Sequence, residues 1–152
     1  MDIVLLIAAA VVAWELLKPR SAGAAVAASG ASSNYGLPSN LPLAVAQVES
    51  GGRQYDSAGN VIMSPAGAIG MMQLMPGTAA DLGVDPYDAS QNFAGGSEYL
   101  NQLYAQYGNV PDTLAAYNWG PGNVNRALAN GTPYPSSVQG YIASVEAALA
   151  NL

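Results

Sequence analysis

One carboxyl stands out by its position. Glu49 lies near the end of a short, otherwise apolar stretch at residues 41–50, directly before Ser50. A carboxyl placed where an apolar helix meets a cleft is partly desolvated, and desolvation raises its pKa so that it stays protonated near neutral pH. A protonated carboxyl can donate its proton to a glycosidic oxygen, and such general acid catalysis typically raises the reaction rate by about 10²–10⁴-fold. On position alone, however, Glu49 is more simply a solvated residue at a helix end.

Two later segments carry polar side chains between glycines. Residues 64–76 read Ser-Pro-Ala-Gly-Ala-Ile-Gly-Met-Met-Gln-Leu-Met-Pro, and residues 116–122 read Ala-Tyr-Asn-Trp-Gly-Pro-Gly. One acid, a Gly-rich polar segment and a Tyr-Asn turn can together build a cleft that binds and cleaves a sugar. This combination favours a catalytic role for Glu49 over a solvated residue without a function.

In this order the motifs resemble the catalytic domain of the soluble lytic transglycosylases, goose-type lysozyme-like enzymes that cut peptidoglycan. That family has a Glu-Ser pair at the end of its first helix, then Ser-Pro-x-Gly-Ala-x-Gly-Leu-Met-Gln-x-Met-Pro, then Ala-Tyr-Asn. Residues 64–76 match the second motif at nearly every position, with Met71 in place of Leu. Residues 92–100 are similar to a fourth motif, Asn-x-x-x-Gly-x-x-Tyr-Leu, which we expect to be scaffold. The resemblance covers about residues 37–150.

The resemblance implies roles for the residues that match. Glu49 is the expected catalytic acid. Ser64 and Gln73 are expected to hydrogen-bond saccharide near the scissile bond, and Met75 to line the cleft. The same segment also contains Gly67, Gly70 and Met72, which we expect to serve turns and packing.

Further roles are implied for the last third of the chain. Tyr117 is expected to direct its hydroxyl at the Glu49 carboxyl, and Asn118 to organise a turn or contact sugar. Tyr141 matches a family tyrosine of the last helix that faces the cleft. Trp119 stands where the family often has Ala, so it is either a sugar-stacking side chain at the cleft edge or a buried one.

The implied reaction uses a single acid, without a metal or another cofactor. Glu49 protonates the oxygen between N-acetylmuramic acid and N-acetylglucosamine, and a 1,6-anhydromuramic end results. Two other hypotheses remain open: a hydrolytic muramidase on the same fold, and a wall-binding or structural module without activity. Hydrolysis needs a second carboxylate. Asp56 is a candidate for it, because it lies in a 51–63 loop that is longer than the family commonly has.

The composition excludes several classes of function. The 152 residues carry 9% charged side chains, a net charge of −6, and neither Cys nor His. The acidic balance excludes a nucleic-acid partner, since phosphate binding needs Lys and Arg. Without Cys or His there is no thiol nucleophile, no Ser-His triad and none of the common zinc sites. The chemistry therefore rests on carboxylates, hydroxyls or amides.

The first twenty residues form a separate hydrophobic segment. Residues 3–14 are an unbroken apolar run, and we expect a hydrophobic helix over 1–20 that anchors the protein in a membrane or in an assembly. Lys18 and Arg20 follow the run, and flanking positive charge favours retention in the cytoplasm. Retention in the cytoplasm would separate the enzyme from the cell wall. A protein carried inside a phage particle avoids this separation, so virion association is one hypothesis. An anchored or exported enzyme of the bacterial cell envelope is the other, although Asp2 and the absence of Lys and Arg before the apolar run do not fit a signal peptide.

The remaining chain predicts an all-α, lysozyme-like compact domain at 37–152 after an Ala/Ser/Gly-rich linker at 21–36. The first helix is expected to be capped by Ser39 or Asn40. It should bury Val45 and Val48, helped by Leu43 and Ala44. The expected helices lie at 41–50, 78–82, 88 or 90 to 107, 111–118, 123–129, and from 136 or 137 onward.

Overall fold

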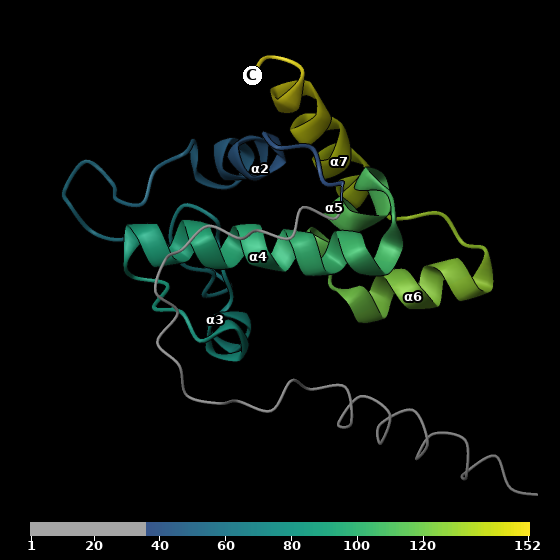
Figure 1. The fold of residues 1–152 in the computed structure, drawn as a ribbon, viewed down its shortest axis with the longest axis horizontal. Coiled ribbons are helices and arrows are strands. Elements are labelled where there is room, and N and C mark those ends of the chain that lie inside the picture. The colour runs from purple at the N-terminus through teal and green to yellow at the C-terminus, as the bar shows by residue number, and fades with distance from the viewer. Residues whose placement is uncertain (1–35) are drawn as a thin grey trace, which may run out of the picture. The chain divides into compact units, whose positions relative to one another are not determined.

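The computed structural model describes residues 36–152. Over this range the fold is all-α, and Figure 1 shows its helices. Their bounds are α2 Leu41–Ser50, α3 Pro76–Leu82, α4 Ala89–Tyr107, α5 Val110–Trp119, α6 Pro121–Asn130 and α7 Ser136–Leu149. The hydrophobic helix predicted at 1–20 and nearly all of the predicted linker lie outside the described residues. Within them, no helix is long and apolar enough to cross a membrane.

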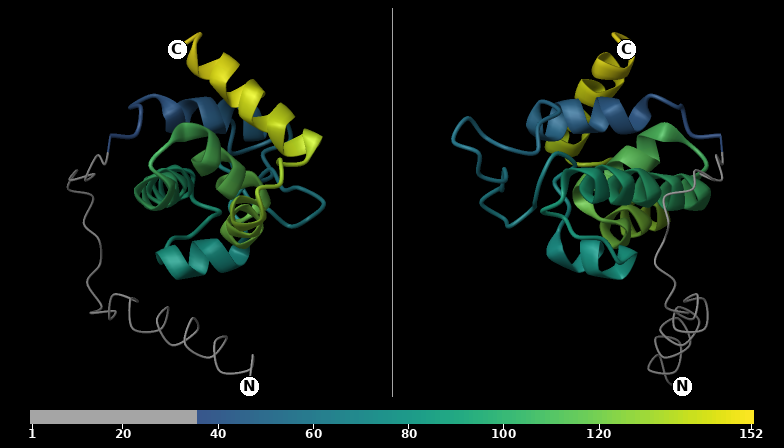
Figure 2. Two further views of the ribbon diagram at one scale, coloured as in Figure 1. Left: turned by 90° about the vertical axis from the view of Figure 1, so that its right-hand side faces the viewer. Right: turned by 60° about the vertical axis from the view of Figure 1, so that its left-hand side comes forward.

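Helix α5 lies at the centre of the helical packing. It contacts α4, α6 and α7, and α2 packs against both α7 and α4. Leu114, Ala115 and Ala116 of α5 are completely buried, and the small side chains of Ala115 and Ala116 allow helices to approach closely. Figure 2 shows α7 crossing α2 in both views. This crossing places the C-terminal end of α2 beside α7.

Glycine and proline set most helix ends, as predicted. Gly83, Gly108 and Gly131 follow α3, α4 and α6 in the left-handed conformation, with φ of 69°, 70° and 62°. The predicted helix starts at 78, 111 and 123 were late by one or two residues. Proline occupies the first or second position of α3, α5 and α6, where its missing N–H costs nothing.

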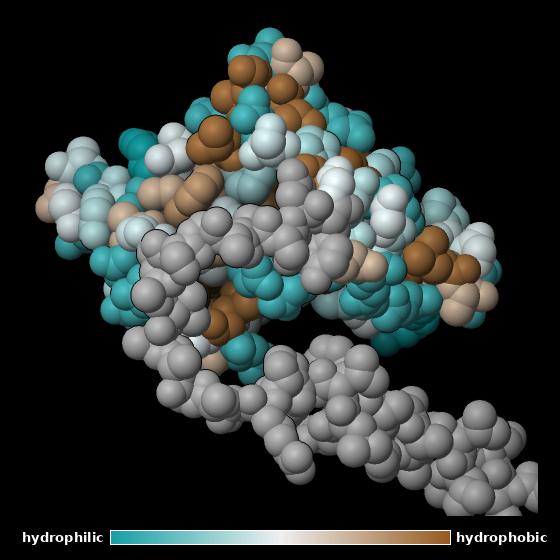
Figure 3. Space-filling model, viewed as in Figure 1, coloured by the Kyte–Doolittle hydropathy of each residue, from teal (hydrophilic) through white to brown (hydrophobic). Residues whose placement is uncertain are grey.

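For α2, the predicted N-cap residue was correct in position only, and the predicted burial of Leu43 was wrong. Asn40 is the N-cap residue but makes no side-chain capping bond. Leu43 is 50% exposed, because it lies on the face of α2 away from the core. On the side of the molecule shown in Figure 3, apolar side chains over α7 and over the end of α6 are separated by hydrophilic ones.

The segment between α2 and α3 has no regular strand. Isolated bridges join Tyr55 to Val61, Met63 to Ile69 and Ile69 to Leu74. Gly67 and Gly70 adopt positive φ of 88° and 77°, and both serve turns as expected. Figure 2 shows the first part of this segment projecting beyond the helices, while its second part returns to the core through the buried residues Ile69, Met72 and Leu74.

Candidate active site

Glu49 lies in the last turn of α2, half-buried, with its carboxyl toward α7. Tyr141 of α7 donates a hydrogen bond from its hydroxyl to Glu49 Oε1 at 2.7 Å. Burial raises the pKa of Glu49, and the hydrogen bond from Tyr141 lowers it in part. The C-terminal end of a helix also carries partial negative charge, which disfavours a carboxylate. The surroundings of Glu49 therefore shift its equilibrium toward the protonated form.

The tyrosine that contacts Glu49 is Tyr141 and not Tyr117. The Tyr117 hydroxyl donates instead to the carbonyl oxygen of Met72 at 2.7 Å, so the expected contact with the Glu49 carboxyl was wrong. Burial raises the pKa of Tyr117 well above its usual range, and the nearby charge of Glu49 raises it further. Tyr117 thus binds the backbone of the Gly-rich segment, and the charge of Glu49 acts on its hydroxyl.

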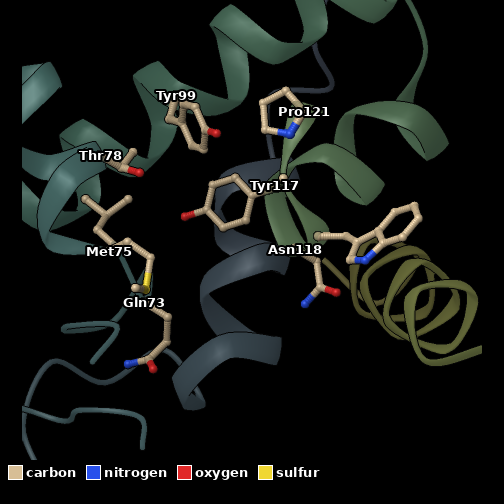
Figure 4. A pocket seen from close by; sticks show the side chains of 10 residues that line it. Gln73, Met75, Thr78, Tyr99, Tyr117, Asn118 and Pro121 are labelled. Carbon is tan, nitrogen blue, oxygen red and sulfur yellow. The ribbon is translucent and has the colours of Figure 1, made fainter. Parts of the chain in front are cut away.

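A pocket of about 370 Å³ opens beside Tyr117, within the usual range of small-ligand sites of about 300–1,000 Å³. Figure 4 shows side chains of α3, α4 and α5 around it. Of the predicted site residues, Gln73, Met75, Tyr117 and Asn118 line it, whereas Glu49 and Tyr141 do not. Thr78 and Tyr99 also line it, although no motif predicted a site role for them. The rings of Tyr99 and Tyr117 lie 5.5 Å apart. The sequence does not indicate that Tyr99 lines a pocket, because Tyr99 reaches the pocket only through the packing of α4 on α5.

The Gly-rich segment places Gln73 in this pocket with an unusual backbone. Its φ is 49°, a left-handed value, and its side chain donates from Nε2 to the Gly70 carbonyl at 2.7 Å. Met75 is 46% exposed. Ser64 does not line this pocket: its half-buried Oγ accepts a hydrogen bond from the Ala68 N–H at 3.0 Å. It closes a turn, and its hydroxyl proton stays free to donate.

Trp119 combines the two expectations for it. It is half-buried, lines the pocket, and packs edge-on against Tyr134 with ring centroids 6.2 Å apart. The Tyr134 hydroxyl donates to Asp112 Oδ1 at 2.6 Å. This pair connects the segment before α7 to the first turn of α5, beside the Trp119 ring.

Asp56, the candidate for a second carboxylate, is fully exposed in its loop. Its Oδ1 accepts from the N–H groups of Ala58 and Asn60 at 2.8 and 2.9 Å. Its Oδ2 accepts from the Asn60 side chain at 3.3 Å. Hydrogen bonds from Asn60 hold the pKa of Asp56 below its usual value. Asp56 therefore stabilises the turn that carries it. Among residues 36–152, no three acidic side chains gather in a group that could hold a metal ion.

Comparison with known families decides the relationship. The model of the family described as "Transglycosylase SLT domain" matches residues 27–136, well over half of the chain. The chain belongs to this family. The matched region begins within the predicted linker and ends at the start of α7, so Glu49, the Gly-rich segment and the Tyr-Asn turn all lie inside it.

Relatives in the SLT family come from a phage and from bacteria. The transglycosylase of Enterobacteria phage PRD1 is 39% identical over 109 residues, which are 71% of this chain and 38% of the phage protein. The soluble lytic murein transglycosylase of Escherichia coli K12 is 35% identical over 106 residues, 62% of this chain and 16% of the bacterial protein. The chain thus spans less than half of either relative.

Solved structures of SLT enzymes share the fold. The 70 kDa soluble lytic transglycosylase of Escherichia coli matches with a TM-score of 0.64 and 32% identity, over 75% of this chain and 21% of that protein. An inactive glutamate-to-glutamine mutant of Slt from Pseudomonas aeruginosa matches with a TM-score of 0.60 and 28% identity, over 77% of this chain and 22% of that protein. These matches confirm the predicted lysozyme-like all-α domain.

Proposed function

We propose that this protein is a peptidoglycan lytic transglycosylase in which Glu49 is the only catalytic acid. The geometry of Glu49 carries the proposal: a half-buried carboxyl with a raised pKa, which is hydrogen-bonded to Tyr141 and whose charge also raises the pKa of the pocket residue Tyr117. Family membership supports it, and so does the inactive glutamate-to-glutamine mutant of the Pseudomonas enzyme.

Each step of the proposed reaction is a proton transfer at Glu49 coupled to a bond change. The protonated carboxyl gives its proton to the oxygen that joins N-acetylmuramic acid C1 to N-acetylglucosamine, and that C–O bond breaks. The muramic N-acetyl group stabilises the oxocarbenium-like centre at C1. Glu49, now a carboxylate, accepts the proton of the muramic 6-hydroxyl as its oxygen bonds to C1. The product is a 1,6-anhydromuramic end, and no water is consumed.

The position of Asp56 favours this single-acid route over hydrolysis. Two-carboxylate glycosidases hold their acids about 5–9.5 Å apart on opposite sides of the bond. Glu49 itself is not among the ten residues that line the pocket, so the pocket lining does not distinguish the two routes. Asp56 is occupied by its own turn, and Asp56→Asn can keep the Oδ1 contacts of that turn. We therefore expect this variant to cleave peptidoglycan at the wild-type rate. A loss of tenfold or more would assign Asp56 to the reaction.

The decisive experiment identifies the ends that the protein leaves. Purified peptidoglycan is digested with the wild-type protein, with Glu49→Gln and with the control Glu146→Gln, which alters an exposed carboxyl of α7. Mass spectrometry then reports the muropeptide ends. We expect anhydromuramic ends from wild type and control, and a loss of about 10²–10⁴ in rate for Glu49→Gln. Reducing ends would indicate a hydrolytic muramidase. Binding to sacculi without cleavage would indicate a wall-binding module.

For the biological setting, we propose that the protein is carried by a phage particle and opens the host cell wall during genome entry. The phage relative, at 39% identity over 71% of this chain, supports this setting. Residues 1–20 are then the segment that binds a membrane or other virion proteins. The bacterial relatives favour the other setting, an enzyme of the cell envelope.

A deletion tests the setting separately from the chemistry. A protein that lacks residues 1–20 is expected to keep its turnover on purified peptidoglycan while it disappears from purified particles, as measured by mass spectrometry of virions. The substitution Glu49→Gln serves as the converse control, since it should enter particles without cleaving the wall. Absence of the full-length protein from particles would refute virion association.

A further inference from the structure

Four side chains hold the backbone of two consecutive residues, Met71 and Met72. The Met71 N–H donates to Gln54 Oε1 at 2.8 Å, and its carbonyl accepts from Ser50 Oγ at 2.9 Å. The Met72 N–H donates to Asn92 Oδ1 at 2.8 Å, and its carbonyl accepts from the Tyr117 hydroxyl at 2.7 Å. Every polar backbone group of the pair is thus bound by a side chain, whereas most backbone groups in proteins bond to other backbone groups. We call this arrangement the Met71–Met72 clamp.

The two amides of the clamp are buried and attached to a second loop. Gln54 is 4% exposed and Asn92 is completely buried. Gln54 Nε2 donates to the Pro86 and Tyr87 carbonyls at 2.9 and 3.2 Å, and Asn92 Nδ2 donates to the Pro86 carbonyl at 2.9 Å. Each amide uses its oxygen on the clamped pair and its nitrogen on residues 86–87, and Asn92 Nδ2 also donates to the Ile69 carbonyl at 2.8 Å. The clamp therefore fixes the pair against a loop that precedes α4.

The residue that follows the clamped pair is Gln73, which lines the pocket. Among the described residues it is the one non-glycine with positive φ, at 49°. Such a conformation is costly for a side chain and persists only when its surroundings enforce it; strained residues of this kind cluster at functional sites. The clamp supplies that enforcement immediately before Gln73.

We propose that Gln54 is a positioning residue for the reaction and that it acts through Gln73. Gln54 fixes Met71, and the fixed pair holds Gln73 in its left-handed conformation with the amide at the pocket wall. Gln54 comes from the 51–63 loop, which we expect to be longer than the family commonly has. The inference rests on the proposed function for its catalytic consequence but not for the clamp itself.

The first test compares two Gln→Met substitutions in the full-length protein. Gln54→Met keeps the length of the side chain and removes its amide. Gln91→Met is the matched control, because Gln91 is an exposed residue that binds the Asp85 N–H in the same 84–88 region and does not contact the clamp. Rates of muropeptide release are measured over a range of sacculus concentrations and corrected for the folded fraction. We expect Gln54→Met to lower kcat by roughly tenfold to a hundredfold with little change in KM, and Gln91→Met to leave both unchanged.

A double-mutant cycle shows whether the effect passes through Gln73. In a Gln73→Ala background the amide that Gln54 positions is gone, so adding Gln54→Met is expected to change kcat by less than about twofold. A loss as large as in the wild-type background would overturn the proposal. So would a Gln54→Met protein that loses only thermal stability and keeps its kcat.

Hydrogen exchange measures the clamp without reference to activity. Gln54→Met is expected to speed exchange of the Met71 N–H by more than tenfold, and Gln91→Met to leave it unchanged. Unchanged exchange in Gln54→Met would refute the clamp. Faster exchange in a protein whose wild type cleaves no peptidoglycan would refute the proposed function, and with it the catalytic role of Gln54, while the clamp would stand.

Discussion

Asn92 allows the stability effect of one buried amide to be worked out from its contacts. Its side chain makes three hydrogen bonds, to the Met72 N–H and to the carbonyls of Ile69 and Pro86. The substitution Asn92→Leu keeps the branching of the side chain and removes all three. The two carbonyls keep other partners, since Ile69 still accepts from the Leu74 N–H and Pro86 from Gln54 Nε2. The Met72 N–H alone is left buried without a partner.

These contacts set the expected magnitude. An orphaned buried donor costs about 1–3 kcal/mol, and each lost bond to a carbonyl that keeps a second partner about 0.5–1.5 kcal/mol. The expected destabilisation by Asn92→Leu is therefore about 2–6 kcal/mol. Most domains have a total stability of about 5–15 kcal/mol, so the variant should unfold at a much lower urea concentration.

Urea titrations followed by far-UV circular dichroism measure this loss. The midpoint should fall while the slope m is unchanged, because the surface exposed on unfolding stays nearly the same. Asn130→Leu, at the exposed end of α6, is the control and should remain within about 0.5 kcal/mol of wild type. A loss below about 1 kcal/mol for Asn92→Leu would refute the reasoning, since it would mean that the Met72 N–H is not left without a partner.

Three further predictions follow from the site and the core. Tyr141→Phe removes the bond that lowers the pKa of Glu49, so the alkaline limb of the pH–rate profile should move to higher pH; a shift to lower pH would contradict this assignment. Because burial raises the pKa of Glu49 above 4.5, folding favours its protonated form, and this stability is lost as pH rises through the raised pKa. Urea titration should therefore show the stability of Glu49→Gln relative to wild type increasing as the pH rises from 4.5 through the raised pKa of Glu49. In thermal unfolding, Gly96→Ala should lower the melting temperature of the protein, because the added Cβ would lie 2.7 Å from Met72 Cβ. Gly140→Ala should raise the melting temperature, because a Cβ added there meets no atom within 4 Å.

The helices could be predicted from the sequence because their signals are local. Gly83, Gly108 and Gly131 end helices in the left-handed conformation that glycine adopts without strain. Leu43 shows the limit of this reasoning. Its type predicts burial, but the partners of α2 are α7 and α4, and which face they cover depends on the whole fold.

The candidate site was predictable as a set of residues and not as a set of contacts. Glu49, Gln73 and Tyr117 follow from motifs along the chain. The contact between Glu49 and Tyr141 joins residues 92 positions apart, and it exists because α7 packs against α2. No local pattern selects between Tyr117 and Tyr141 as its partner, since both are helical tyrosines that pack against the same core cluster.

The local rules that this chain breaks lie close together. Glu49 is an ionisable group with a raised pKa in the last turn of a helix, and Gln73 is a non-glycine residue with left-handed backbone. Tyr117 interacts with both regions. The charge of Glu49 raises the pKa of Tyr117, and the Tyr117 hydroxyl donates to the carbonyl of Met72, the residue before Gln73. Departures of this kind destabilise a domain, and proteins retain them chiefly at sites where function requires them. Their convergence on one tyrosine, beside one pocket, argues that the fold holds Glu49 and Gln73 in place for chemistry on the same substrate.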